Sequence, residues 1–237
     1  MTTAKTPQAP KLTKRAVVDR ALEHADSQGL DTLTIRKLAT ELGVTPMALY
    51  WHFRSKEELL GGLVERVWGE IDVNVDPAAR WPDQLRALME SLVAVLRAHP
   101  AAARLLLSFE KQSPAAMRPT EVTLEILRSA GFDPEYAAGI ARNALWTAIM
   151  LVMSDPTAEL LSPEELADHQ RMKQITYATL PLATYPRLVE CAVQLTAYND
   201  PEFQYELGVS IFIAGVEALA ARRANGNDPA QSATDGP

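Results

Sequence analysis

The chain of 237 residues has little of what a secreted or membrane-spanning protein needs. Cys191 is its only cysteine, so no intrachain disulfide can form and a reducing cytoplasm is the expected compartment. Met1–Leu12 is polar and lacks the apolar core of a signal peptide. The longest uncharged runs, such as Asn143–Ser154, fall short of the roughly 20 residues of a membrane helix. These deficits predict a cytoplasmic protein without membrane contact.

Groups for metal binding and catalysis are also sparse. The four histidines show no spacing typical of metal ligands: His24, His52, His99 and His169. No phosphate-binding glycine loop and no nucleophile elbow occur. Glu57–Glu58 and Glu164–Glu165 lie where helices are expected to begin, and we interpret them as helix N-terminal charge rather than acid–base pairs. We therefore predict no metal, no cofactor and no enzymatic activity.

The net charge of −7 is unevenly distributed. Residues 1–75 carry ten basic and ten acidic side chains, so the whole excess of negative charge lies in residues 76–237. Within residues 34–56, four cations accompany one anion. The N-terminal part can therefore attract phosphate locally, while the acidic remainder discourages non-specific adhesion to nucleic acid.

The pattern of residues 34–56 predicts two short helices joined at Gly43. Thr34 is a suitable N-cap, and apolar residues then recur at helical spacing: Ile35, Leu38, Ala39 and Leu42. Gly43 suits a helix end, and Thr45–Pro46 suits a new start. Two helices separated by a short glycine-containing turn form the helix-turn-helix arrangement, whose second helix enters the DNA major groove.

The second of these helices has two unlike faces. Leu49 and Phe53 share one face, and the other carries Met47, Tyr50, Trp51 and Arg54. DNA offers thymine methyls and phosphates to such an outward face. The alternative is that the aromatic residues pack against another part of the same chain. The basic residues nearby favour DNA.

Helical patterns without strand-like alternation continue along the chain and predict an all-α fold. Thr13 caps a first helix that ends at Gly29, and Ser55–Glu58 is predicted as a capping box that opens a helix to about Ile71. Gly61–Gly62 inside that helix permits either close packing or bending. The later helices are expected at Trp81–Ala98, Ala101–Lys111, Thr120–Ala130, Pro134–Met153, Pro163–Thr179, Pro186–Tyr198 and Pro201–Arg223.

This pattern predicts a small N-terminal domain and a larger helical one. The expected parts are a disordered arm at 1–10, a helix-turn-helix DNA-binding domain at 11–56, a linking helix at 57–75, a ligand-binding and dimerisation domain at 76–224, and a disordered tail at 225–237.

Residues 137–152 and 207–216 are apolar nearly all round, so both helices need cover on two faces. A four-helix bundle made by two subunits would provide it, and a dimer suits a protein that contacts two half-sites. The predicted interface residues are Ala141, Leu145, Ala148, Leu207, Ile211, Gly215 and Ala218. The alternative is a monomer with a deeply buried central helix.

The apolar composition of the larger domain also predicts a pocket for an uncharged or weakly polar organic ligand. Its candidate lining residues are Leu88, Leu92, Phe109, Met117, Trp146 and Met150. The alternative for each is a plain core position.

The sequence resembles the tetracycline-repressor (TetR) family of bacterial transcriptional repressors. The match is carried by Leu33–Leu60, in the runs L-T-I-R-K-L-A-T-E-L-G-V and A-L-Y-W-H-F-R-S-K-E-E-L-L. Further likeness to the tetracycline-repressor subgroup lies in the larger domain, at Trp81 with Asp83, Leu85 and Arg86, at Arg118–Thr120, and at Gly208–Val209 with Gly215–Glu217. The resemblance implies an all-helical homodimer that leaves a double-stranded DNA operator when a small-molecule ligand binds.

The resemblance also implies residue roles. Residues that would face the groove are Arg36, Pro46, Met47, Ala48, Tyr50 and Trp51, and those that would contact phosphates are Thr34, Tyr50, His52 and Lys56. Thr45, the expected cap of the second helix, completes the predicted DNA-binding set.

The match has two departures. Pro46 and Ala48 stand where the subgroup has glutamine and threonine, so its operator is not carried over. Leu88 and Leu92 replace an asparagine and a phenylalanine of the drug pocket, and no metal-binding histidine aligns near Pro114. We therefore predict a ligand-responsive repressor with an apolar ligand. The competing hypothesis is a helical carrier of small molecules with a vestigial head.

Overall fold

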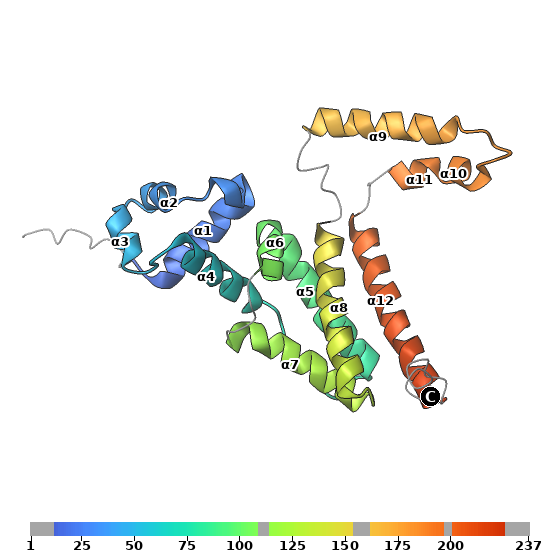
Figure 1. Cartoon of the computed structure of the whole chain (residues 1–237), viewed down its shortest axis with the longest axis horizontal. Coiled ribbons are helices and arrows are strands. Elements are labelled where there is room, and N and C mark those ends of the chain that lie inside the picture. Colours follow the sequence, from blue (N-terminus) through green and yellow to red (C-terminus); the bar gives the residue numbers. More distant parts are fainter. Residues whose placement is uncertain (1–11, 109–113, 154–161, 197–200, 226–237) are drawn as a thin grey trace, which may run out of the picture. The chain divides into compact units, whose positions relative to one another are not determined.

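A computed structural model describes residues 12–108, 114–153, 162–196 and 201–225 (Figure 1). These ranges contain helices and no strand, which confirms the all-α prediction. The predicted arm at 1–10 and nearly all of the predicted tail lie outside the described residues. The chain divides into two compact units, residues 1–145 and 146–237, and the boundary falls inside helix α8.

The N-terminal part of the first unit contains the predicted three-helix head and the linking helix. Its elements are α1 (Lys14–Gln28), the 3₁₀ turn η1 (Leu30–Thr32), α2 (Ile35–Glu41), α3 (Pro46–Tyr50) and α4 (Lys56–Trp68). All four α-helices start at a hydroxyl side chain that accepts a hydrogen bond from the backbone N–H three residues on: Thr13, Thr34, Thr45 and Ser55. The linking helix ends at Trp68, three residues before the predicted Ile71.

One hydrophobic core holds these elements together. Leu38, Leu49 and Phe53 are fully buried in it, together with residues of α1 and α4. Gly62 lies where an added Cβ would stand 3.1 Å from Val18 and 3.2 Å from the Phe53 ring. Of the two roles open for this glycine, close packing is therefore the one observed. The missing side chain lets α4 approach α1 and the end of α3.

The rest of the first unit is built from α5 (Trp81–Ala98), α6 (Pro100–Ser108), α7 (Pro114–Ser129) and the first two thirds of α8 (Pro134–Val152). Helix α5 packs against α6 and α7, and α6 and α7 both contact α4. The end predicted for the second of these helices, at Lys111, lies outside the described residues.

Helix α7 begins six residues before the predicted Thr120. The predicted start was wrong because Pro119, which precedes Thr120, does not end helical structure and lies buried inside the helix. The Thr123 hydroxyl donates a hydrogen bond of 2.8 Å to the Pro119 carbonyl. A hydrogen bond from the Thr123 side chain to its carbonyl therefore accompanies Pro119 in the second turn of α7.

The second unit contains the end of α8, then α9 (Pro163–Ala178), α10 (Pro186–Glu190), α11 (Ala192–Thr196) and α12 (Pro201–Ala224). Helices α10 and α11 replace the single helix predicted at Pro186–Tyr198, because the chain leaves helical geometry at Cys191. Both short helices contact α9. Helix α12 approaches the end of α8 so closely that a Cβ on Gly208 would stand 2.3 Å from Leu151.

Candidate nucleic-acid interface and ligand cavity

The turn between α2 and α3 has the backbone that the sequence predicts. Gly43 has a φ of 66°, in the left-handed region that favours glycine. The Thr34 hydroxyl accepts a hydrogen bond of 3.2 Å from the Lys37 N–H. The Thr45 hydroxyl accepts one of 3.3 Å from the Ala48 N–H. Thr34 and Thr45 therefore already serve as helix caps in the absence of any partner.

The outward face of α3 is exposed. Trp51 is 86% exposed, Met47 67% and Tyr50 48%, whereas Leu49 and Phe53 are fully buried. The division into two faces is confirmed, and the described chain leaves most of Trp51 and Met47 and about half of Tyr50 uncovered. Large apolar side chains this accessible indicate a binding surface.

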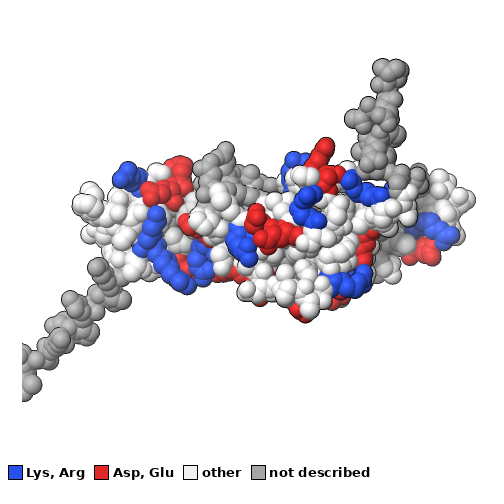
Figure 2. Space-filling view, turned by 90° about the horizontal axis from the view of Figure 1, so that it is seen from below, with Lys and Arg blue, Asp and Glu red and all other residues white. Residues whose placement is uncertain are grey.

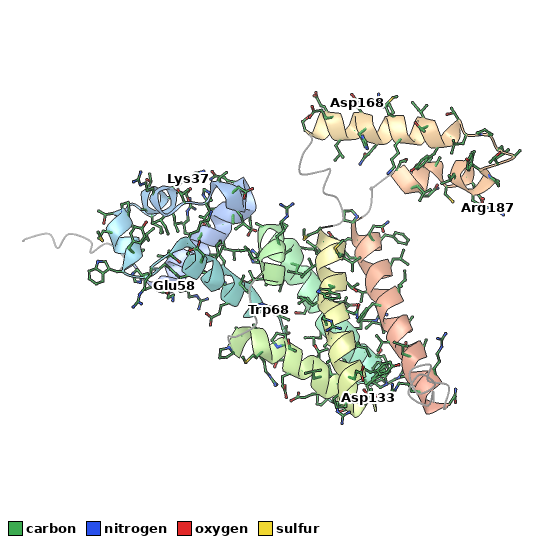
Figure 3. The ribbon with its side chains drawn as sticks, viewed as in Figure 1. Lys37, Glu58, Trp68, Asp133, Asp168 and Arg187 are labelled. Atoms are coloured by element: carbon green, nitrogen blue, oxygen red, sulfur yellow. The ribbon has the colours of Figure 1, made fainter. Side chains whose placement is uncertain are left out.

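The other predicted DNA-binding residues surround this face. Those exposed are Thr34, Arg36, Thr45 and Pro46, and those half-buried are Ala48, His52 and Lys56. Lys37 donates a hydrogen bond of 2.6 Å to Gln28, and the first turn of α2 contains no acidic residue. Figure 3 labels Lys37 beside α2, and Figure 2 shows several Lys and Arg side chains over this end of the unit. Lys37 is thus oriented by its contact with Gln28, and the turn that holds Arg36 and Lys37 contains no carboxylate.

A buried histidine on α1 contacts a carboxylate at the end of α2, and no local pattern in the sequence indicates this contact. His24 has no exposed side-chain surface, and its Nδ1 lies 2.7 Å from Glu41 Oε1. Its Nε2 lies 2.9 Å from the Thr32 hydroxyl, and Arg20 Nε lies 3.0 Å from the other Glu41 oxygen. Burial raises the pKa of Glu41, but the hydrogen bonds and charges of His24 and Arg20 outweigh it and lower the pKa. This cluster holds the first helix of the helix-turn-helix in place.

The start of α4 departs from the predicted capping box. Ser55 Oγ accepts a hydrogen bond from the Glu58 N–H, as expected. The Glu58 carboxylate, labelled in Figure 3, instead accepts one of 2.8 Å from the Arg54 N–H, one residue before the cap. Lys14 Nζ lies 3.4 Å from the same carboxylate and 4.9 Å from the centre of the Phe53 ring. Glu58 therefore links the end of the α3 segment to α1.

A small apolar cavity lies within the first unit, between the end of α4 and helices α5, α7 and α8. It encloses about 40 Å³. Its lining residues come from the end of α4 and from α5, α7 and α8: Trp68, Ile71, Leu85, Leu88, Met89, Leu92, Pro119, Thr120, Thr123, Ala141, Ala144 and Leu145. Thr123 donates its hydroxyl to the Pro119 carbonyl, so the wall exposes few free polar groups. Such a wall suits an apolar ligand.

The structure brings together two of the six predicted ligand residues, Leu88 and Leu92. Met117, Trp146 and Met150 are exposed, at 51%, 48% and 62%, and do not line this cavity. Phe109 lies outside the described residues. Helical spacing could have added Leu85 and Met89, which share the buried face of α5 with Leu88 and Leu92.

The predicted dimer residues lie on two helices, α8 and α12, and differ in their exposure. On α12, Leu207, Ile211, Gly215 and Ala218 are exposed, as an interface requires. On α8, Ala148 is fully buried and Leu145 is 7% exposed. Ala141 and Leu145 line the cavity. Burial against their own chain leaves Leu145 and Ala148 little surface for a second subunit, because the apolar pattern of α8 does not show which side faces its own chain; the role of Ala141 stays a prediction. The exposed face of α8 carries Arg142, Asn143, Trp146 and Met150.

Metal sites and membrane spans are both absent from the part of the chain that the structure describes. No group of three or more His, Cys, Asp or Glu side chains is placed to hold a metal ion. None of the described helices combines the length and apolarity needed to cross a membrane.

Comparison with known proteins covers nearly the whole chain. The family model described as bacterial regulatory proteins of the tetR family matches residues 17–63, and the model described as the tetracyclin repressor-like C-terminal domain matches residues 75–220. The tetracycline repressor protein class C of Escherichia coli is 30% identical over 211 residues, which cover 88% of this chain and 92% of that protein. An HTH-type transcriptional regulator of Saccharopolyspora erythraea is 28% identical over 221 residues, which cover 89% and 87% of the two chains.

A solved structure agrees with these matches. It is the crystal structure of the Streptomyces coelicolor TetR family protein ActR in complex with actinorhodin. It superposes with a TM-score of 0.75 at 30% identity, and the match covers 88% of this chain and 98% of that one.

The contacts of Glu58 predict acid sensitivity. The Arg54 N–H lowers the pKa of Glu58, with a further contribution from Lys14. A lowered folded-state pKa stabilises the fold above the unfolded value, about 4.3 for glutamate, and that stability disappears as the pH falls through the folded value. We expect Glu58→Gln to lower the thermal midpoint at neutral pH and to flatten its fall below a pH of about 4.3. Circular dichroism melts test this, with Glu65→Gln, exposed on the same helix, as the control. Parallel pH profiles for wild type and Glu58→Gln would contradict it.

Proposed function

Because the chain belongs to the tetR family of bacterial regulatory proteins, we propose that it is a transcriptional repressor that binds a pseudo-palindromic operator as a homodimer and is released by a small, largely apolar organic ligand. The observation that carries this proposal is the exposed Met47–Tyr50–Trp51 face of α3, held outward by two fully buried residues. The relatives are regulators, and we propose no catalytic activity and no cofactor. A cytoplasmic location follows from a DNA partner.

In this proposal α3 enters the major groove. Met47 and Trp51 supply apolar contact for thymine methyls, and the Tyr50 hydroxyl reaches a phosphate. Arg36 and Lys56 lie at the N-terminal turns of α2 and α4, where the helix dipole also favours a phosphate. The His24–Glu41 brace keeps α2, and with it the turn to α3, in the orientation that this docking needs. The proposed parts are the DNA-binding domain at 11–56, the linking helix at 57–75 and the ligand-binding domain at 76–224.

The proposed dimer interface lies on the exposed stripe of α12. Leu207, Ile211 and Gly215 follow one another at helical spacing and are exposed. An added Cβ on Gly215 would meet no atom within 4 Å, whereas Gly208 is already packed against its own chain. The stripe on α8 with Trp146 and Met150 supplies the second helix of the proposed intermolecular bundle.

The proposed ligand site is the apolar cavity of the first unit. Its free volume of about 40 Å³ is far below the roughly 300–1,000 Å³ of a drug-sized site, so a ligand must enlarge it. Enlargement displaces the wall, which includes Trp68 and Ile71 at the end of the linking helix. The actinorhodin complex of ActR supports the proposal that a matching fold accommodates an organic ligand.

The repressor and carrier hypotheses differ in the effect of Tyr50→Ala. A repressor loses about 1–3 kcal/mol of site binding, roughly 5- to 150-fold in Kd, because the ring's contact in the groove and the hydroxyl's contact with a phosphate are both removed from an exposed position. Fluorescence anisotropy measures this loss with duplexes from upstream of the protein's own gene and with scrambled DNA, at two salt concentrations. Tyr185→Ala, 44% exposed in the second unit, is the matched control. If neither the own-gene duplex nor one from a genome-wide selection binds more tightly than scrambled DNA, the carrier hypothesis replaces the repressor.

Charge on the α12 stripe should separate the subunits. Ile211 is 64% exposed, and Ile211→Glu places a carboxylate in the proposed bundle without disturbing the core. We expect the wild type to sediment as a dimer and Ile211→Glu as a folded monomer. Ala224→Glu, exposed at the end of the same helix, should remain dimeric. A monomeric wild type, or an unchanged dimer in Ile211→Glu, would contradict the proposed interface.

Ligand class can be tested by thermal shift. Uncharged or weakly polar polycyclic compounds should raise the thermal midpoint, because a ligand at 100 times its Kd adds about 2.7 kcal/mol. Ala144→Phe fills the cavity from an 8% exposed position and should abolish the shift. Stabilisation by highly charged compounds alone would rule out the apolar site.

A further inference from the structure

His99 bridges two carboxylates from separate parts of the first unit, one on α1 and one just after α4. It is the residue between α5 and α6. Its Nδ1 lies 2.7 Å from Asp26 Oδ2 on α1, and its Nε2 lies 2.9 Å from Glu70 Oε2, two residues after the end of α4. The three side chains are between 18% and 25% exposed. A ring with a proton on both nitrogens donates to both carboxylates at once.

Two further residues extend this bridge into a closed loop. Arg66 on α4 pairs with Glu70, and its Nε donates a hydrogen bond of 2.8 Å to Asp19 on α1. These contacts run in series from Asp19 through Arg66, Glu70 and His99 to Asp26, so both ends of the series lie on α1. Asp26 Oδ1 is buried and has no hydrogen-bond partner among the described residues, so His99 supplies the hydrogen bond that this carboxylate has there. We call Asp19, Asp26, Arg66, Glu70 and His99 the charge loop.

The charge loop adjoins the cavity through the end of α4. Glu70 is separated by one residue from Trp68 and is followed directly by Ile71, and both of these side chains line the cavity. Figure 3 labels Trp68 at the end of α4. Leu92, seven residues before His99 on α5, lines the same cavity. The backbone that forms the cavity wall therefore also carries one carboxylate partner of His99.

We propose that His99 is the positioning residue through which the state of the cavity sets the position of α1 and hence of the DNA-binding head. This inference rests on the proposed ligand-released repressor. When the cavity is enlarged, Trp68 and Ile71 move outward and carry the Glu70 carboxylate away from the His99 ring. The bridge to Asp26 then no longer ties α1 to the end of α4, and the head loses its orientation for the operator.

A substitution can stand in for the ligand, which is unidentified. Ala144→Phe overfills the cavity, and Ala94→Phe, exposed on α5, adds the same ring outside it. His99→Phe combined with Asp26→Leu removes the bridge without leaving a buried carboxylate unpaired. The experiment compares five full-length proteins. They are the wild type, Ala144→Phe, Ala94→Phe, the His99→Phe/Asp26→Leu pair, and the triple variant that adds Ala144→Phe to the pair. Circular dichroism and sedimentation establish that each is folded and assembled, and anisotropy measures the Kd for the duplex that the wild type selects.

The expected pattern is non-additive. Ala144→Phe weakens duplex binding about tenfold, Ala94→Phe less than about twofold, and the folded pair about tenfold. The triple variant binds within about twofold of the pair, because both changes release the same bridge. A triple variant weakened about a hundredfold, or a pair that binds like the wild type, overturns the proposal.

If the His99→Phe/Asp26→Leu pair does not fold, a single substitution at His99 tests the same role. His99→Gln carries both of its N–H donors on one nitrogen and can keep one of the two carboxylate contacts, so it should bind the duplex more weakly than the wild type and more tightly than the pair, and keep a response to Ala144→Phe. A folded His99→Gln protein that no longer responds overturns the role of these hydrogen bonds. A wild type that selects no duplex overturns the proposed function, whereas a selective wild type with additive variants overturns only the role of His99.

Discussion

Burial of Leu49 and Phe53 holds α3 in place, and the candidate DNA-binding surface depends on it. A helix of five residues has too few internal hydrogen bonds to be stable alone, so tertiary contacts must fix it. Both side chains are fully buried, and Gly62 leaves the space that the Phe53 ring needs. Because the helical period is fixed, anchoring these two residues turns Tyr50 and its aromatic neighbours outward. The exposed face is thus a direct result of packing on the opposite side.

Directional polar contacts then orient the helices around that core. Apolar packing alone tolerates sliding, whereas a carboxylate that accepts hydrogen bonds at 2.7–3.0 Å specifies one arrangement. Glu41 links α2 to α1, and Glu58 links the end of the α3 segment to α1. His99 connects α1 with the cavity wall at the end of α4. Helix α1 therefore contacts residues next to the candidate DNA-binding surface and, through His99, the segment that follows α4 and borders the cavity.

Prediction from the sequence succeeded where local patterns decide the structure. Threonine caps, the glycine turn and the two faces of α3 depend on neighbouring residues, and all were found as predicted. It failed where distant contacts decide. Pro119 lies inside α7 instead of starting it, and α10 and α11 replace one predicted helix. The nearly uniform apolar pattern of α8 could not show that Leu145 faces the cavity while Trp146 is exposed.

The sequence by itself determined the all-α class, the helix-turn-helix and the identity of the outward aromatic residues, because capping, helical period and turn chemistry act over a few residues. Only the tertiary structure decided which apolar residues enclose the cavity, since Trp68 and Leu88 meet there from separate helices. It also decided the partners of His24 and His99. His99 lies 73 positions from Asp26 and 29 from Glu70, and no local pattern encodes contacts over such separations.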